Sequence, residues 1–199
     1  MSTTHKVHGV VPREAVPRPI DPRVNIGHVH LKTADIERIR QFYVDILGFD
    51  VIVRMGDDAL FIAAGGYHHT LGFNTWESKG GTPPPPGTTG LYHVAIRYPT
   101  RAALGDALRR LVQAEYPLSG VNDHGTHEAL YLDDPDGNGL ELCWDREESE
   151  WPRDAEGHLT FGNRRLDLAG LLAEGAAPEE LDSAGHWQPP AKAAAEPEA

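Results

Sequence analysis

The chain has 199 residues, of which 40% are hydrophobic, so it is long enough and apolar enough for one ordinary domain with a real core. Its formal net charge is −12, and residues 145–199, with 13 acids and 5 bases, carry −8 of that charge. Neither part has a basic stripe that would follow a phosphate backbone, so we expect no nucleic-acid partner. No stretch reaches the roughly 18 apolar residues that a bilayer span needs, and the N-terminus lacks a signal-peptide layout. We therefore expect no membrane association and a cytoplasmic location.

Cys143 is the single cysteine of the chain. One cysteine excludes an internal disulfide and suits a reducing cytosol. A lone thiol in a strand more often packs as a small hydrophobe than reacts, so we do not expect Cys143 to be catalytic.

The first half of the chain reads as an extended arm followed by a βαβββ unit. Residues 1–24 are rich in proline and form the predicted arm. From Ile26 onward the pattern changes: residues 27–32 alternate as a half-buried strand does, and the next apolar residues recur at helical spacing until Gly48 ends the helix. Three extended runs follow, at residues 50–54, 59–63 and 69–76. We assign residues 25–79 to this first module.

The second half repeats the first. A stiff Gly/Pro connector at residues 80–90 precedes a second predicted βαβββ module at residues 91–150, in which Tyr92-His93-Val94 stands where Gly27-His28-Val29 stands in the first. When the two repeats are aligned so that Gly65 matches Gly137, His69 aligns with Glu141. Residues 151–175 are expected to form a C-terminal extension with a short helix, and residues 176–199 a disordered tail.

These patterns predict an α+β fold of two paired βαβββ modules. Each module alone would leave one sheet face bare, so we expect the two to meet face to face and enclose a cleft that contains a metal. His28 and His93 are equivalent in the two repeats and should both face this cleft. Glu141 lies between two leucines on a strand that ends in apolar residues, where an unpaired carboxylate would be costly to bury.

Two imidazoles and one carboxylate form a facial triad that leaves three positions open on an octahedral ion. The predicted ligands are therefore His28, His93 and Glu141, and the predicted metal is Fe(II), with Mn(II) as the alternative. A closed four-ligand zinc site would leave no room for a bidentate substrate and oxygen. The plainer alternative is that both histidines are ordinary strand residues and that Glu141 is solvated.

The ordered set of short motifs resembles the vicinal oxygen chelate superfamily, and within it the small catechol 2,3-dioxygenase type of extradiol enzyme. The resemblance covers residues 24–151. Its motifs are Gly27-His-Val-His-Leu31, Phe42-Tyr43, Leu47-Gly-Phe49, His68-His-Thr-Leu-Gly-Phe73, Tyr92-His-Val94, His124-Gly125, and Tyr131 through Asp134-Pro-Asp-Gly-Asn138 to Glu141.

The resemblance implies the same three ligands and further active-site residues at His69, His124 and Tyr131. The spacing of His124 differs from that in larger family members, so His127 is the alternative at this place. The glyoxalase type has a carboxylate at both fourth-strand positions, whereas this chain has His69 at one, and a histidine suits proton transfer near neutral pH. A fourth metal ligand and a core histidine stay open as alternatives for His69.

The implied reaction is cleavage of a small aromatic diol by O2 next to its two hydroxyl groups. The alternatives are a metal-dependent glyoxalase-like isomerase, an antibiotic-modifying thiol transferase, and a metal-free binding protein of the same fold. We expect a homodimer, because symmetric pairs are the commonest soluble assemblies.

Overall fold

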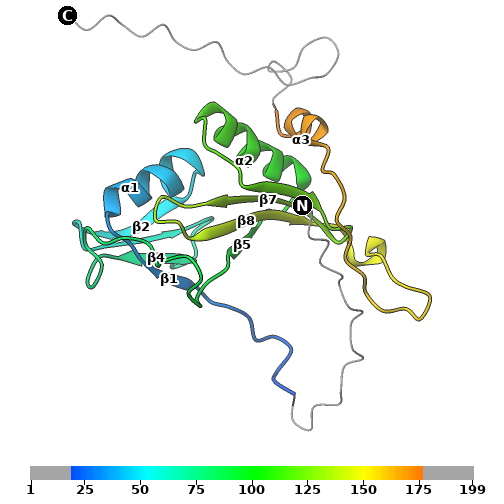
Figure 1. Cartoon of the computed structure of the whole chain (residues 1–199), viewed down its shortest axis with the longest axis horizontal. Helices are drawn as coiled ribbons and strands as arrows, with labels where there is room; N and C mark the ends of the chain where they lie inside the picture. Colours follow the sequence, from blue (N-terminus) through cyan, green and yellow to red (C-terminus); the bar gives the residue numbers. More distant parts are fainter. Residues whose placement is uncertain (1–18, 177–199) are drawn as a thin grey trace, which may run out of the picture.

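The computed structural model of the chain describes residues 19–176 (Figure 1). The predicted N-terminal arm of residues 1–24 lies mostly outside this range, and the predicted tail of residues 176–199 lies almost entirely outside it. No helix in the described range is long and apolar enough to cross a membrane.

The first module has the predicted βαβββ order. Its elements are β1 (Val29–Lys32), α1 (Ile36–Arg40), a π-helical segment (Gln41–Ile46), β2 (Asp50–Met55), β3 (Ala59–Ala63) and β4 (Leu71–Asn74). The helix begins after Asp35, whose side chain accepts hydrogen bonds from the backbone N–H groups of Glu37 and Arg38. It ends at Gly48, whose φ of 86° lies in the left-handed region that glycine adopts without strain. The strands form one sheet in the order β1-β4-β3-β2, with β1 and β4 parallel and the other pairs antiparallel.

The second module repeats this topology. Its elements are β5 (Val94–Arg97), α2 (Arg101–Gln113), β6 (Gly120–Asp123), β7 (His127–Asp133) and β8 (Gly139–Asp145). The strand order is β5-β8-β7-β6, again with one parallel pair, β5 and β8, at the start. The α+β fold of two βαβββ modules is thus confirmed.

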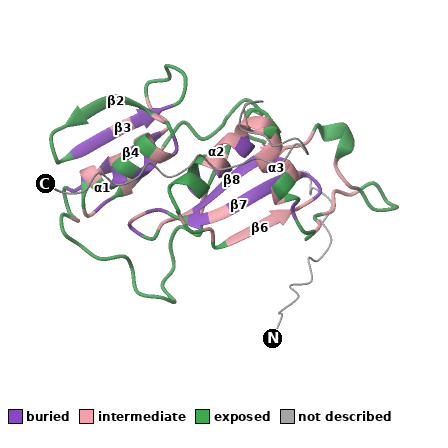
Figure 2. Ribbon diagram, turned by 90° about the horizontal axis from the view of Figure 1, so that it is seen from above, coloured by how far each residue is buried: buried purple, intermediate pink, exposed green. Residues whose placement is uncertain are grey.

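The helices cover one side of both sheets, and the sheets lie side by side (Figures 1 and 2). Strand residues alternate accordingly: Val29 and Leu31 of β1 pack against the core, whereas His30 and Lys32 are exposed on the other face. One apolar cluster runs through both modules. In each sheet, the face away from the helices is called here the open face.

The two modules are joined by the turn between β7 and β8. Asp136 of this turn accepts hydrogen bonds from Thr33 and Arg38 at the start of α1. The buried Tyr43 hydroxyl donates to Asp134 of the same turn at 3.2 Å. These contacts, together with the shared core, fix the position of one module against the other.

The C-terminal extension folds back onto the second module. After a short 3₁₀ helix (Glu148–Glu150), the backbone N–H of Gly162 donates to the carbonyl of His124 at 2.7 Å. The extension ends in α3 (Leu168–Glu174), which packs on α2. The predicted terminal helix is present, but it begins only at Leu168, because the side chain of Asp167 caps it by accepting from the N–H of Gly170.

Candidate metal centre

Strand register brings three polar residues together on the open face of the second sheet. Tyr131 of β7 lies directly opposite Glu141 of β8, and β5 pairs with the other side of β8. His93 immediately precedes β5, and its Nε2 lies 2.9 Å from Oε2 of Glu141. Two of the three predicted ligands, His93 and Glu141, are therefore in direct contact.

Glu141 is only 6% exposed, and its carboxylate is satisfied by polar neighbours. Its Oε1 lies 3.0 Å from Nε2 of His127 and accepts a hydrogen bond from the Tyr131 hydroxyl at 3.2 Å. The hydrogen bond from His127 lowers the pKa of Glu141 against the opposing effect of burial, and His93 adds to the lowering. Glu141 is therefore an ionised carboxylate at neutral pH, which is the form that binds a metal ion.

His124 completes this cluster through Tyr131. Its Nε2 lies 2.8 Å from the Tyr131 hydroxyl, and its Nδ1 lies 3.0 Å from the carbonyl oxygen of Gly162. A carbonyl can only accept, so in neutral His124 the proton lies on Nδ1 and Nε2 is left as an acceptor. The single hydroxyl proton of Tyr131 then points at one of two acceptors, Nε2 of His124 or Oε1 of Glu141, and not at both at once. Burial, and then the charge of Glu141, raise the pKa of Tyr131 far above its usual value, so the phenol keeps its proton. The C-terminal extension thus sets the tautomer of a predicted site residue.

His127 is part of the cluster as well as His124. Among the described residues, the group of three whose candidate ligand atoms all lie within 4.8 Å of one another is His124, His127 and Glu141. The sequence interpretation treated the two histidines as alternatives for one place. The signal for His127 was its position on β7, where residues 127, 129 and 131 share a face.

His28 and His69 lie together on the first module instead. Their ring centroids are 4.4 Å apart, and Nδ1 of His69 lies 2.8 Å from Nδ1 of His68. Burial, followed by the neighbouring imidazoles of His28 and His68, lowers the pKa of His69. His28 is exposed and is not a member of the group around Glu141.

Two expectations about the region of His69 are wrong. First, the extended run predicted from residue 69 begins only at Leu71, so His69 precedes β4, and its ring contacts that of His68. Second, β1 pairs Val29 with Leu71 and β5 pairs Val94 with Leu140, so the residue equivalent to Glu141 is Gly72 and not His69. The first module therefore has Gly72, and no carboxylate, at the position equivalent to Glu141.

The donor set of the second module fits a divalent transition metal. Imidazole nitrogens with one carboxylate suit iron and manganese, and here the carboxylate is buried, ionised and surrounded by nitrogen donors. His93 and His127 contact different oxygens of Glu141, so the carboxylate lies between them. Either histidine could share a metal ion with it.

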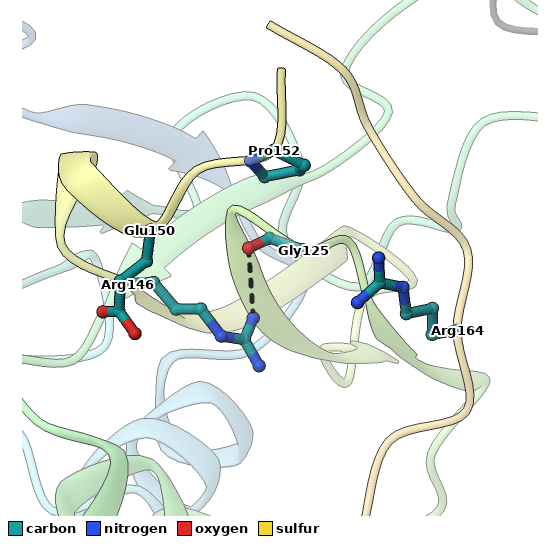
Figure 3. Close-up of a pocket in the computed structure, with 5 residues that line it drawn as sticks. All are labelled: Gly125, Arg146, Glu150, Pro152 and Arg164. Atoms are coloured by element: carbon teal, nitrogen blue, oxygen red, sulfur yellow. Dashed lines mark hydrogen bonds between the residues drawn. The ribbon is translucent and has the colours of Figure 1, made fainter. Parts of the chain in front are cut away.

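A small pocket lies between the second module and the C-terminal extension (Figure 3). Its volume is about 230 Å³, and it is lined by Gly125, Arg146, Glu150, Pro152 and Arg164. The guanidinium of Arg146 already binds the carboxylates of Asp123 and Glu128, both at 2.9 Å. Its charge is therefore neutralised, and neither His93 nor Glu141 lines the pocket. We attribute the pocket to the packing of the extension rather than to the chemistry of the metal centre.

A family model described as the Glyoxalase/Bleomycin resistance protein/Dioxygenase superfamily matches residues 25–142. The chain is 39% identical over 150 residues to a catechol-2,3-dioxygenase of Bacillus subtilis, covering 75% of this chain and 52% of that protein. It is 32% identical over 127 residues to biphenyl-2,3-diol 1,2-dioxygenase 3 of Rhodococcus globerulus, covering 62% of this chain and 63% of that protein. The chain thus spans between about half and two thirds of the length of these relatives.

Solved structures share the fold at lower identity. The crystal structure of a glyoxylase/bleomycin resistance protein/dioxygenase domain from Frankia sp. matches with a TM-score of 0.54 and 21% identity, over 63% of this chain and 94% of that one. A glyoxalase/dioxygenase from Nostoc punctiforme matches with a TM-score of 0.51 and 19% identity, over 67% of this chain and all of that one.

Proposed function

The chain belongs to the glyoxalase/bleomycin resistance protein/dioxygenase superfamily, and from this premise we propose that it is an extradiol dioxygenase that cleaves a small aromatic diol with O2. Relatives named as catechol and biphenyl-diol dioxygenases support the reaction class. The proposed compartment is the cytoplasm, since the single cysteine is free and buried.

The observation that carries the proposal is the buried, ionised carboxylate of Glu141 in contact with His93. A carboxylate in this position is costly unless it is paired or binds a metal. We propose that His28, His93 and Glu141 hold Fe(II), with Mn(II) as the alternative. The bound ion would supply Lewis acidity toward the diol oxygens and an open position for O2.

The neighbouring residues have distinct proposed roles. Tyr131 keeps its proton and is placed to donate a hydrogen bond to a diol oxygen beside Glu141. His124, whose Nδ1 is engaged by Gly162, offers Nε2 on the same side and stabilises bound substrate or oxygen. His69, next to His28, takes a proton from the diol or returns one.

The test loads the purified protein with Fe(II) without air, adds catechol in air, and follows oxygen uptake together with a yellow ring-cleaved product. Glu141→Gln should abolish both uptake and metal binding, because an amide of the same size carries no charge. Asp145→Asn is the matched control, since Asp145 is on the same strand and face but outside the cluster, and it should keep both.

Other outcomes identify the alternatives. Bound metal without oxygen uptake across a panel of substituted catechols would point to a glyoxalase-like isomerase or an antibiotic-modifying enzyme. Absence of bound metal, with ligand affinity unchanged by His93→Ala, would point to a binding protein.

A further inference from the structure

We propose that Arg146 is a positioning residue for the proposed reaction: its guanidinium holds the hairpin turn between β6 and β7, which carries His124 and His127. Arg146 directly follows β8 and acts through this turn rather than on the substrate. The inference deepens the proposed function, because it rests on the role given there to His124.

The hairpin turn presents its side chains to two sides of the sheet. The backbone N–H of His124 donates to the carbonyl of His127 at 2.9 Å, which closes the turn. Both imidazoles lie in the cluster around Glu141. Asp123 and Glu128, the next residues outward on the two strands, are paired in register, and side-chain alternation directs them to the opposite side. The two imidazoles are therefore held only as firmly as this carboxylate pair behind them.

Asp123 and Glu128 need a cation between them, because like charges directly opposite each other destabilise a hairpin. Arg146 supplies it. Its Nη1 lies 2.9 Å from Oδ1 of Asp123, and its Nη2 lies 2.9 Å from Oε1 of Glu128. The planar guanidinium has a fixed spacing between these two nitrogens, so it sets the separation of the two strand ends as well as neutralising them.

Arg146 also holds the main chain of the turn. Its guanidinium donates to the carbonyl of Gly125 at 3.4 Å (Figure 3), and its backbone N–H donates to the carbonyl of Thr126 at 2.9 Å. Asp123, the carboxylate that Arg146 binds, accepts from the N–H of Gly125 at 2.7 Å. The carbonyl of Arg146 in turn accepts from the indole N–H of Trp151 at 2.9 Å, which attaches the C-terminal extension at the same place.

The site depends on where this turn places the ring of His124. Nδ1 must reach the carbonyl of Gly162, 3.0 Å away, while Nε2 lies 2.8 Å from the Tyr131 hydroxyl. A displacement of the turn lengthens both contacts, and the proton of neutral His124 is then no longer confined to Nδ1. A misplacement of about 1 Å can cost roughly 100-fold in rate, so a residue outside the site can control it.

Arg101 of α2 provides a matched control. It binds the same buried carboxylate, with its Nε 2.8 Å from Oε2 of Glu128, and its side chain is 19% exposed against 20% for Arg146. Within residues 19–176, its ion pairs run to Glu128 and to Glu174 of α3, away from the turn. A loss of stability alone should therefore be similar for the two arginines, whereas an effect on His124 should belong to Arg146.

The kinetic test compares Arg146→Lys with Arg101→Lys in the iron-loaded full chain. Lysine keeps the charge but lacks the fork that joins two carboxylates. We expect Arg146→Lys to lower kcat for catechol about 10- to 100-fold while KM changes less than about threefold, because the residues proposed to bind the diol remain. Arg101→Lys should keep kcat within about twofold. Equal kcat values for the two variants would overturn the proposal.

A spectroscopic test does not depend on activity. Nitrogen-15 NMR of labelled histidine, in the full chain loaded with diamagnetic Zn(II), reports which ring nitrogen carries the proton, and His124→Asn identifies the signals of His124. The wild-type protein and Arg101→Lys should show the proton on Nδ1, and Arg146→Lys should show an average of both tautomers. Unchanged His124 signals in Arg146→Lys would overturn the proposal.

A double variant covers the case in which Arg146→Lys does not fold, as judged by circular dichroism. Asp123→Asn with Arg146→Gln removes one charge of each sign and leaves Glu128 paired with Arg101. It should fold and show the same loss of kcat and the same averaged His124 signal; wild-type values for both would overturn the proposal. If the wild-type protein takes up no oxygen, the proposed function fails, whereas the NMR comparison still decides whether Arg146 positions His124.

Discussion

Replacing Asp136 with Asn should destabilise the protein by loosening the second module from the first. Asp136 is 9% exposed, and its carboxylate accepts hydrogen bonds from Thr33, from Arg38 and, at 3.3 Å, from the backbone N–H of Ala34. Asn has nearly the same size but carries no charge to pair with Arg38. Its amide NH₂ would also face groups that are themselves hydrogen-bond donors. A hydrogen bond to a charged group contributes about 1.5–3 kcal/mol, and the half-exposed Arg38 places this one toward the lower end.

We therefore expect a loss of about 1–3 kcal/mol, which for a chain of this size lowers Tm by roughly 2–12 °C. Urea denaturation followed by circular dichroism measures the free energy of unfolding. The matched control is Asp133→Asn, at the end of β7 and next to the same turn. Asp133 is exposed, and the Tyr116 hydroxyl donates to its main-chain carbonyl at 2.8 Å, a contact that the substitution keeps. Equal stability of the two variants would refute the role of Asp136 in joining the modules.

Three further predictions concern packing, a buried thiol and the site. Gly105→Ala should lower the free energy of unfolding by about 1–3 kcal/mol, although alanine favours helices over glycine by about 1 kcal/mol. The reason is that a Cβ at this position would clash with the backbone carbonyl of Leu171 in α3 and lie 2.9 Å from the backbone nitrogen of Gly175. A higher melting temperature for the variant in thermal denaturation would contradict this. Burial, then the charge of Glu141, raises the pKa of Cys143 to about 12, so a thiol reagent at pH 8 should label only the unfolded chain. Because this pKa is raised by folding, its stabilising effect is complete below about pH 9 and is lost as the pH rises toward 12, and Cys143→Ala should flatten that alkaline loss. Tyr131→Phe should keep the metal content but lower the rate of ring cleavage about 100-fold, and an unchanged rate would remove Tyr131 from the proposed mechanism.

Local patterns in the sequence were enough to determine both βαβββ modules. A period of two residues marks half-buried strands, and helical spacing up to Gly48 marks the first helix, because each pattern reports which side of one element meets the core. The repeat then made His28 and His93 equivalent. The apolar residues beside Glu141 also indicated a buried carboxylate, which is costly unless it is paired or binds a metal.

Register between distant strands was decided only in the folded chain. Aligning Gly65 with Gly137 assumed that the loops before β4 and β8 have equal length. The first loop covers residues 64–70 and the second residues 134–138, so Gly72 takes the place that the alignment gave to His69. Hydrogen-bond pairing between strands depends on the course of these loops, which side-chain alternation does not encode.

Convergence of the site also required the tertiary structure. His124 and His127 were alternatives in the sequence, but the sharp turn at Gly125 and the returning extension bring both beside Glu141. The placement of the two open faces side by side likewise depends on long-range contacts such as Asp136 with Arg38, across 98 residues of sequence. Sequence periodicity determines which face of a sheet is bare, whereas what meets that face depends on packing between elements far apart in the chain.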